Sequence, residues 1–234
     1  MVLEELTLPI VLAAAAIDSI NPCAIGVIIF FITALLINKN ERHKLVIFGI
    51  VYIAMVFLTY FLAGLGLIWF QSFLVQAGYS FLLGTVVGIL VILAGLVEIK
   101  DYFWYGYGFS LGIPVWASKK IEEMAQKATL PIAFILGIFV ALVELPCTGG
   151  PYFAITAILA RQFDWTAVQY LFIYNIIFVL PLILILAAAL FGISPEKMEH
   201  LRHEKRGVMR LGIGLLLLFL GYFIMLYYGG FLTF

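Results

Sequence analysis

Charged residues are scarce in this chain: they make up 11% of its 234 residues, whereas a soluble domain carries about 25%. Hydrophobic residues make up 65%, and the mean hydropathy is +1.17. A globule of this size buries too little of its own surface to hide so many apolar side chains from water. We therefore infer that the surrounding solvent is lipid and that the chain is an integral membrane protein.

An excess of charge of either sign is also missing, because the 13 basic and 13 acidic residues cancel. No global field therefore favours nucleic acid as a partner. Residues 1–7 carry Glu4 and Glu5 instead of a basic n-region, so we expect no cleavable signal peptide of the usual form. Two cysteines are too few for a disulfide-rich scaffold or a metal cluster, and we expect neither a metal nor a separate cofactor.

Six long apolar stretches separate cleanly along the chain. Each exceeds the roughly 20 residues that a helix needs to cross a hydrocarbon core. The alternation that marks the strands of a membrane barrel is missing. Because backbone groups in lipid must hydrogen bond internally, we expect an all-α membrane protein with six transmembrane helices. The predicted spans are residues 7–37, 44–70, 77–100, 130–160, 165–191 and 207–232.

The basic residues predict how these spans are oriented. The loops after the first, third and fifth spans hold all the lysine and arginine residues except Arg161. Basic loops stay in the cytoplasm, so we expect both termini outside. We also expect Glu98, near the cytoplasmic end of its span, to reach water. The basic residues of these loops are Lys39, Arg42, Lys44, Lys100, Lys119, Lys120, Lys127, Lys197, Arg202, Lys205, Arg206 and Arg210.

The first and fourth spans differ from the other four. As straight helices they would measure roughly 46 Å, against a hydrocarbon core of about 30 Å. Each has a Pro-Cys pair near its middle, Pro22-Cys23 in one and Pro146-Cys147 in the other. Proline removes a backbone donor and clashes with the preceding turn, so we expect both helices to break there. The run Thr148-Gly149-Gly150-Pro151 follows the second pair and predicts the sharper break.

Matched breaks in two halves of a chain point to a central site in a transporter built from repeats. Residues 1–100 contain one broken span and two plain ones, and so do residues 130–234. Because three is odd, the second three-helix repeat must be inverted relative to the first. The axis relating them would bring equivalent points of the first and fourth spans together. Residues 101–129 between the repeats are expected to form an amphipathic helix on the cytoplasmic surface, or else a solvated linker.

The residues around the breaks suggest what this central site can do. Each cysteine begins a new helical segment, where free N–H groups and the positive end of the helix dipole favour a thiolate. Asn21 is expected to cap the segment that begins at Pro22, and Gly26 to supply some flexibility. Gly149 and Gly150 allow close approach of backbones.

Two carboxyl groups precede the cysteines, Asp18 by five residues and Glu144 by three. A carboxyl group inside a membrane is costly and is therefore a functional candidate, here for carrying protons or tuning the thiols. The alternative is that Asp18 is hydrated near the outer surface, or that either carboxyl hydrogen bonds to backbone freed at a break.

Six spans, inverted halves, the two Pro-Cys pairs and the run from Pro146 to Pro151 resemble the CcdA family, small relatives of the membrane domain of the DsbD reductant transporter. The resemblance implies that Cys23 and Cys147 form a redox-active disulfide. It implies a membrane thiol:disulfide oxidoreductase in the cytoplasmic membrane of a prokaryote. Reducing equivalents would pass from cytoplasmic thioredoxin to thioredoxin-like proteins outside, for example in cytochrome c maturation.

One departure from the family and two other functions have to be weighed. Relatives commonly place further prolines soon after the first cysteine, whereas Ala24-Ile25-Gly26-Val27 follows it here, so we expect a stiffer first break. The chain could instead be a secondary transporter of a small solute or ion, or a passive protein stapled by its cysteines. The placement of both cysteines after proline, at mid-depth in equivalent spans, favours the redox function.

Overall fold

In the computed structural model of this chain, most of the described residues are helical. The structure describes residues 2–20, 25–29, 32, 42–104, 107–111, 115–127, 129–161, 163–191 and 195–229. Within these ranges no residue is in a strand, so the expectation of an all-α protein is confirmed there. The helices are α1 (Val2–Ser19), α3 (Arg42–Gln76), α4 (Ser80–Phe103), α5 (Val115–Lys127), α6 (Leu130–Ala160), α7 (Trp165–Leu190) and α8 (Pro195–Tyr228).

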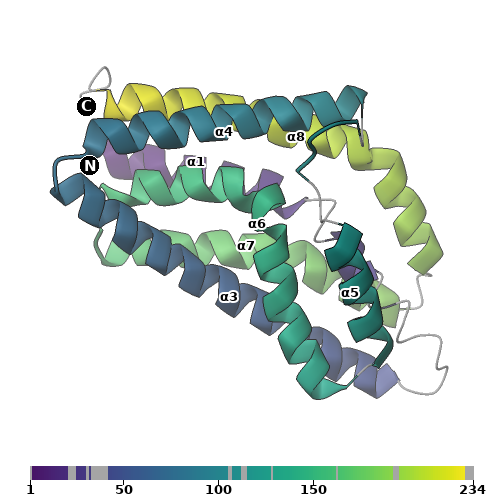
Figure 1. Ribbon diagram of the computed structural model, residues 1–234. Helices are drawn as coiled ribbons and strands as arrows, with labels where there is room; N and C mark the ends of the chain where they lie inside the picture. The colour runs from purple at the N-terminus through teal and green to yellow at the C-terminus, as the bar shows by residue number, and fades with distance from the viewer. Residues whose placement is uncertain are drawn as a thin grey trace.

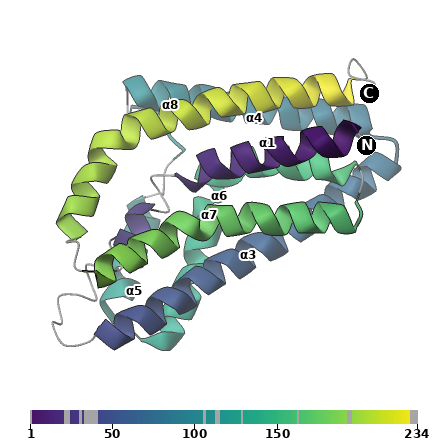
Figure 2. The same cartoon turned by 180° about the vertical axis from the view of Figure 1, so that it is seen from behind.

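The long helices associate in pairs. Helix α4 runs along α8, α3 lies against α6 and α7, and α1 lies against α7 (Figure 1). Both views place α1 and part of α6 between the α4–α8 pair on one side and α3 and α7 on the other (Figure 2). The two ends of the chain lie at the same end of the bundle, opposite α5 (Figure 1).

Within the described residues, four helices are long and apolar enough to cross a membrane, and a fifth span is added if the two arms of α6 are counted as one. They correspond to the second to sixth predicted spans. The first predicted span is represented by the apolar segment Leu8–Ser19, which is too short to cross alone, and much of its remainder lies outside the described residues. The chain is therefore a multi-pass helical membrane protein, while the division into six spans and two inverted repeats stays a prediction.

The outer surface of the bundle is apolar. Large hydrophobic side chains point outward along the spans, among them Phe81, Leu90, Leu184 and Phe219, each more than half exposed. Patches of this extent on a protein in water would drive aggregation, whereas lipid tails solvate them. Among the described residues, the buried charged side chains are Glu98 and Asp101, which pair with Arg210, and the carboxyl groups of Asp18 and Glu144.

Local sequence explains where several helices begin and end. Gly78, with φ +86°, allows the tight turn between α3 and α4, because this conformation is strained for residues with a β-carbon. The Asp164 side chain accepts a hydrogen bond from the Ala167 N–H at 2.9 Å and caps the start of α7. Helix α5 is amphipathic: Ala117 and Ile121 are buried, and its described charged side chains face outward.

Helices α4 and α8 approach closely through two pairs of glycines. A β-carbon on Gly88 would lie 3.0 Å from Gly221 O, and one on Gly221 would lie 2.9 Å from Gly88 O. Gly95 and Gly214 face each other in the same way, at 2.9 and 3.0 Å. Small residues at such crossings let helix backbones pack in lipid, where no hydrophobic force drives association.

Gly95→Ala is expected to destabilise the protein by about 1–3 kcal/mol, because the new methyl group meets backbone atoms of α8. Gly212→Ala is the matched control on the partner helix, since a β-carbon there meets nothing within 4 Å. The control should be neutral or stabilised by up to about 1 kcal/mol. Thermal unfolding in detergent compares the two variants, and equal effects would contradict the close contact at Gly95.

Candidate functional site

The fourth-span break that the sequence predicts coincides with a sharp bend in α6. The arms Leu130–Glu144 and Gly149–Ala160 meet at 82°, and the turn is plain in Figure 1. The bend falls on the Pro-Cys pair of this helix, although the side chains of Pro146, Cys147 and Thr148 lie outside the described residues.

The end of α1 leads to the other predicted break. Helix α1 ends at Ser19, whose hydroxyl donates to the Ala16 carbonyl oxygen at 2.8 Å. The next residues, Asn21, Pro22 and Cys23, lie outside the described part of the chain.

The small residues around the breaks are buried in the bundle. Gly26 is buried in the short helical segment 25–29, and Pro151 is buried in the second arm of α6. A β-carbon on Gly150 would lie 2.6 Å from Leu217 Cδ2, so Gly150 marks a close approach of α6 to α8. Both Gly149 and Gly150 line a cavity of about 430 Å³ between α3, α4 and α6.

Asp18 lies inside the bundle, in the last turn of α1. Its side chain is 1% exposed, and Oδ2 accepts a hydrogen bond from the Tyr174 hydroxyl of α7 at 2.8 Å. The alternative that Asp18 is hydrated near the outer surface is therefore wrong. Tyr174 packs between helices because α1 and α7 lie side by side.

Further polar groups continue from Tyr174 into a buried cluster. The Tyr152 ring of α6 lies 5.5 Å from the Tyr174 ring, and its hydroxyl donates to Tyr60 O on α3 at 2.5 Å. Asn175, also buried, donates from Nδ2 to Leu171 O at 2.8 Å and hydrogen bonds to the Tyr152 hydroxyl. We call these residues the central cluster: Asp18, Tyr60, Tyr152, Tyr174 and Asn175.

Glu144 is the second buried carboxyl group that the sequence singled out. It is 1% exposed at the end of the first arm of α6, directly before the bend. The carboxyl interacts electrostatically with the Tyr52 hydroxyl of α3, which is also fully buried. Each of the two carboxyl groups thus precedes a Pro-Cys pair and faces a tyrosine from a neighbouring helix.

Four tyrosines at these positions were not predicted from the sequence. Their signal was present, because a hydroxyl group in the middle of an apolar span has to find a partner. Gly64 shows how closely Tyr152 is held: a β-carbon there would come within 2.0 Å of its hydroxyl oxygen. The unrecognised residues are Tyr52, Tyr60, Tyr152 and Tyr174.

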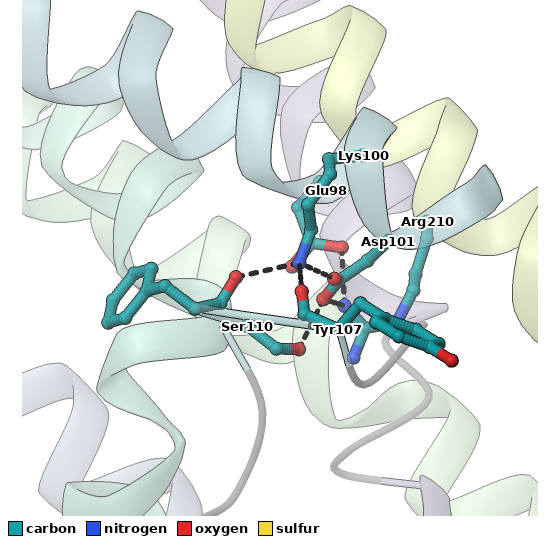
Figure 3. Close-up of polar contacts among 7 residues, drawn as sticks. Glu98, Lys100, Asp101, Tyr107, Ser110 and Arg210 are labelled. Carbon is teal, nitrogen blue, oxygen red and sulfur yellow. Dashed lines mark hydrogen bonds and ion pairs between the residues drawn. The ribbon is translucent and has the colours of Figure 1, made fainter. Parts of the chain in front are cut away.

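A second polar site, the end cluster, joins α4 to α8 (Figure 3). Arg210 Nη1 of α8 lies 3.0 Å from Glu98 Oε2 and 2.8 Å from Asp101 Oδ2, both on α4. Lys100 adds a second positive charge, 2.5 Å from Asp101 Oδ1. Ser110 donates to Asp101, so the end cluster comprises Glu98, Lys100, Asp101, Ser110 and Arg210.

Two expectations about the end cluster were wrong. Glu98 does not reach water, since it is 3% exposed, and Arg210 does not belong to a solvated loop, since it is 1% exposed. A buried charge is tolerated when it is paired and hydrogen bonded, and Glu98 and Arg210 supply opposite charges to each other. The pairing joins residues 112 positions apart, which no local pattern indicates.

The end cluster also holds the segment that follows α4, which includes Tyr107 and Phe109. Lys100 Nζ donates to Tyr107 O at 2.8 Å and to Phe109 O at 2.7 Å (Figure 3). The chain between α4 and α5 is therefore tied back to the helix that it leaves.

No protein-family model, curated protein or solved structure matches this chain. Among the described residues, no group of three or more His, Cys, Asp or Glu side chains could hold a metal ion.

Arg210→Met should destabilise the protein by about 3–5 kcal/mol, because Glu98 and Asp101 would lose their buried positive partner. Lys205→Met, on the exposed part of the same helix, is the matched control and should change stability by no more than about 0.5 kcal/mol. Thermal unfolding in detergent measures both. If the two variants unfold alike, the end cluster contributes nothing to stability.

Proposed function

We propose that this chain carries reducing equivalents across the cytoplasmic membrane of a prokaryote by thiol–disulfide exchange at Cys23 and Cys147. The donor is cytoplasmic thioredoxin, and the acceptors are thioredoxin-like proteins outside, as the resemblance to the CcdA family implies. The observation that carries the proposal is the bend of α6 at Pro146-Cys147, close to the end of α1. Tyr174 contacts both Asp18 in the last turn of α1 and Tyr152 in the second arm of α6.

The proposed inverted repeat is supported by which helices pair. In the two proposed repeats, α1 corresponds to α6, α3 to α7 and α4 to α8. Exchanging each helix for its counterpart turns the α1–α7 contact into the α6–α3 contact. The same exchange leaves the α3–α7 and α4–α8 contacts unchanged. It also exchanges the Asp18–Tyr174 pair with the Glu144–Tyr52 pair. A two-fold axis in the membrane plane accounts for all of these relations.

The proposed orientation is supported by the two ends of the bundle. Arg161 directly follows α6, and its Nη1 donates to Tyr227 O near the end of α8 at 3.1 Å. Helix α5, which carries Lys119 and Lys120, lies at the opposite end of the bundle (Figure 1). Basic residues remain in the cytoplasm, so both termini lie outside.

The reaction moves two electrons and two protons. A thioredoxin thiolate attacks the Cys23–Cys147 disulfide, one cysteine leaves as a thiol, and the second thioredoxin thiol resolves the mixed disulfide. The products are oxidised thioredoxin and a reduced Cys23–Cys147 pair, which then reduces an outer disulfide by the same steps. Because thioredoxin cannot enter lipid, the two breaks have to open the pair to each side in turn.

Glu144 is proposed to exchange a proton with the Cys147 thiol in this reaction. A cysteine reacts as its thiolate, so a thiol in an apolar site needs a nearby acceptor for its proton. Glu144 lies three residues before Cys147, at the start of the bend, and is shielded from solvent. Its carboxyl group is the buried acid closest along the chain to that thiol.

Single cysteine variants test the redox pair. With Cys147→Ser or Cys23→Ser, the remaining thiol should form a mixed disulfide with thioredoxin that lacks its resolving cysteine, because no thiol is left to release it. Non-reducing gels of membranes under mild oxidation measure the adduct. The Cys23→Ser/Cys147→Ser double variant is the control and should form none.

The outcomes separate three functions. Adducts with neither single variant would contradict electron transfer. A solute carrier would keep its transport after both cysteines are replaced. A protein stapled by its disulfide would lose stability in the variants and trap no thioredoxin.

Glu144→Gln should slow reduction of the disulfide by thioredoxin by at least about 100-fold, because the amide cannot exchange a proton with the thiol. Glu123→Gln, an exposed carboxyl on α5, is the control and should react at the wild-type rate. Stopped-flow or quenched alkylation in detergent gives the rates. Equal rates for the two variants would remove Glu144 from the mechanism.

A further inference from the structure

Only one of the two carboxyl oxygens of Asp18 has a hydrogen-bond partner among the described residues. Oδ2 accepts from the Tyr174 hydroxyl, whereas Oδ1 is buried and has no hydrogen-bond partner within the described part of the chain. The group also sits at the C-terminal end of α1, where the helix dipole is negative. Both features disfavour a bare carboxylate at this place.

No described basic side chain balances this charge. The titratable groups facing Asp18 are tyrosines, Tyr174 on α7 and Tyr152 on α6, with Tyr60 on α3 beyond them. From α8, Arg210 is already paired with Glu98 and Asp101 in the end cluster. The other buried carboxyl of α6, Glu144, faces Tyr52. A positive charge from solution would balance the Asp18 carboxylate.

A second buried oxygen of the central cluster also lacks a hydrogen-bond partner among the described residues. Asn175 is 1% exposed, and its Oδ1 has no hydrogen-bond partner among the described residues. Its amide nitrogen donates to Leu171 O and to the Tyr152 hydroxyl, the same hydroxyl that lies within electrostatic range of Asp18. The Asn175 oxygen can accept a proton donor or coordinate a cation, as the free oxygen of Asp18 can.

We propose that Asp18 and Asn175 form a binding site for one monovalent cation, a proton or Na⁺. The donors are oxygens, which suit a hard cation, and a single carboxylate balances a single positive charge. A divalent ion would leave an unpaired positive charge in lipid. Ends of half-helices at mid-membrane serve as cation sites in transporters with broken helices.

The site links cation binding to the contact between α1 and α7. With the cation bound, Asp18 is neutralised and α1 stays seated against Tyr174 of α7. When the cation leaves, the buried charge favours movement of the end of α1 toward water, and Pro22-Cys23 follows at once in the chain. The proposal concerns binding alone and holds whether or not the cysteines carry electrons.

Cation-dependent stability of the purified full-length protein in detergent tests the site. A ligand that binds only the folded state raises its Tm with concentration. We titrate NaCl against KCl at constant ionic strength and alkaline pH, and separately lower the pH without Na⁺. A Tm that rises with Na⁺ but not K⁺ identifies Na⁺, and a Tm that rises only with acid identifies a proton.

Two variants assign the response to its residues. Asp18→Asn is expected to abolish the rise in Tm, and Asn175→Ala to weaken the apparent cation affinity about 10- to 100-fold. Glu144→Gln should keep the response, which separates its titration from that of Asp18. The Cys23→Ser/Cys147→Ser variant should respond like wild type, so that this test is independent of electron transfer.

Three results would overturn the proposal. The first is a wild-type Tm that responds to neither Na⁺ nor acid. The second is an Asp18→Asn variant that responds as the wild type does. The third, which decides the matter if Asp18→Asn fails to fold, is an Asn175→Ala variant with unchanged cation affinity.

Discussion

A polar group inside a lipid bilayer has no water to hydrogen bond with, and the arrangement of this bundle depends on that constraint. Helix backbones satisfy themselves, so the remaining polar groups are the side chains within the spans. Several of them find partners on other helices: Tyr152 donates to Tyr60 O, Tyr228 donates to Ala157 O, and Arg210 pairs with α4. These contacts choose among helix pairings that apolar surfaces alone would leave nearly equal, because lipid tails pack on leucine as well as another helix does.

The same constraint makes the middle of the bundle a candidate site for chemistry. A helix bent by 82° cannot hydrogen bond fully within itself, and the bend in α6 is enclosed by neighbouring helices. The proposed redox pair and the proposed cation site are close along the chain, since Asp18 precedes Cys23 by five positions.

The end cluster and the central cluster differ in the balance of their charges. The end cluster is balanced, with two carboxylates, a guanidinium and an ammonium group, and it fastens α4 to α8 and to the segment after α4. The central cluster has one carboxyl group and hydroxyl or amide partners, and no basic side chain of the described residues balances it. A balanced network suits a fixed joint, and an unbalanced one suits a part of the molecule that exchanges charge with solution.

Several features follow from the sequence alone, because they depend on short stretches and on the lipid solvent. The apolar runs determine helices that cross a membrane, and Pro146 with the residues after it determines a bend in α6. The sequence also singled out Asp18 and Glu144. Only the tertiary structure decided that Glu98 pairs with Arg210 and that tyrosines from other helices meet the two acids. The apolar pattern of a helix predicts that it faces lipid or other helices. It does not predict which side chain of another helix a polar group meets, because that depends on how the helices pack in three dimensions.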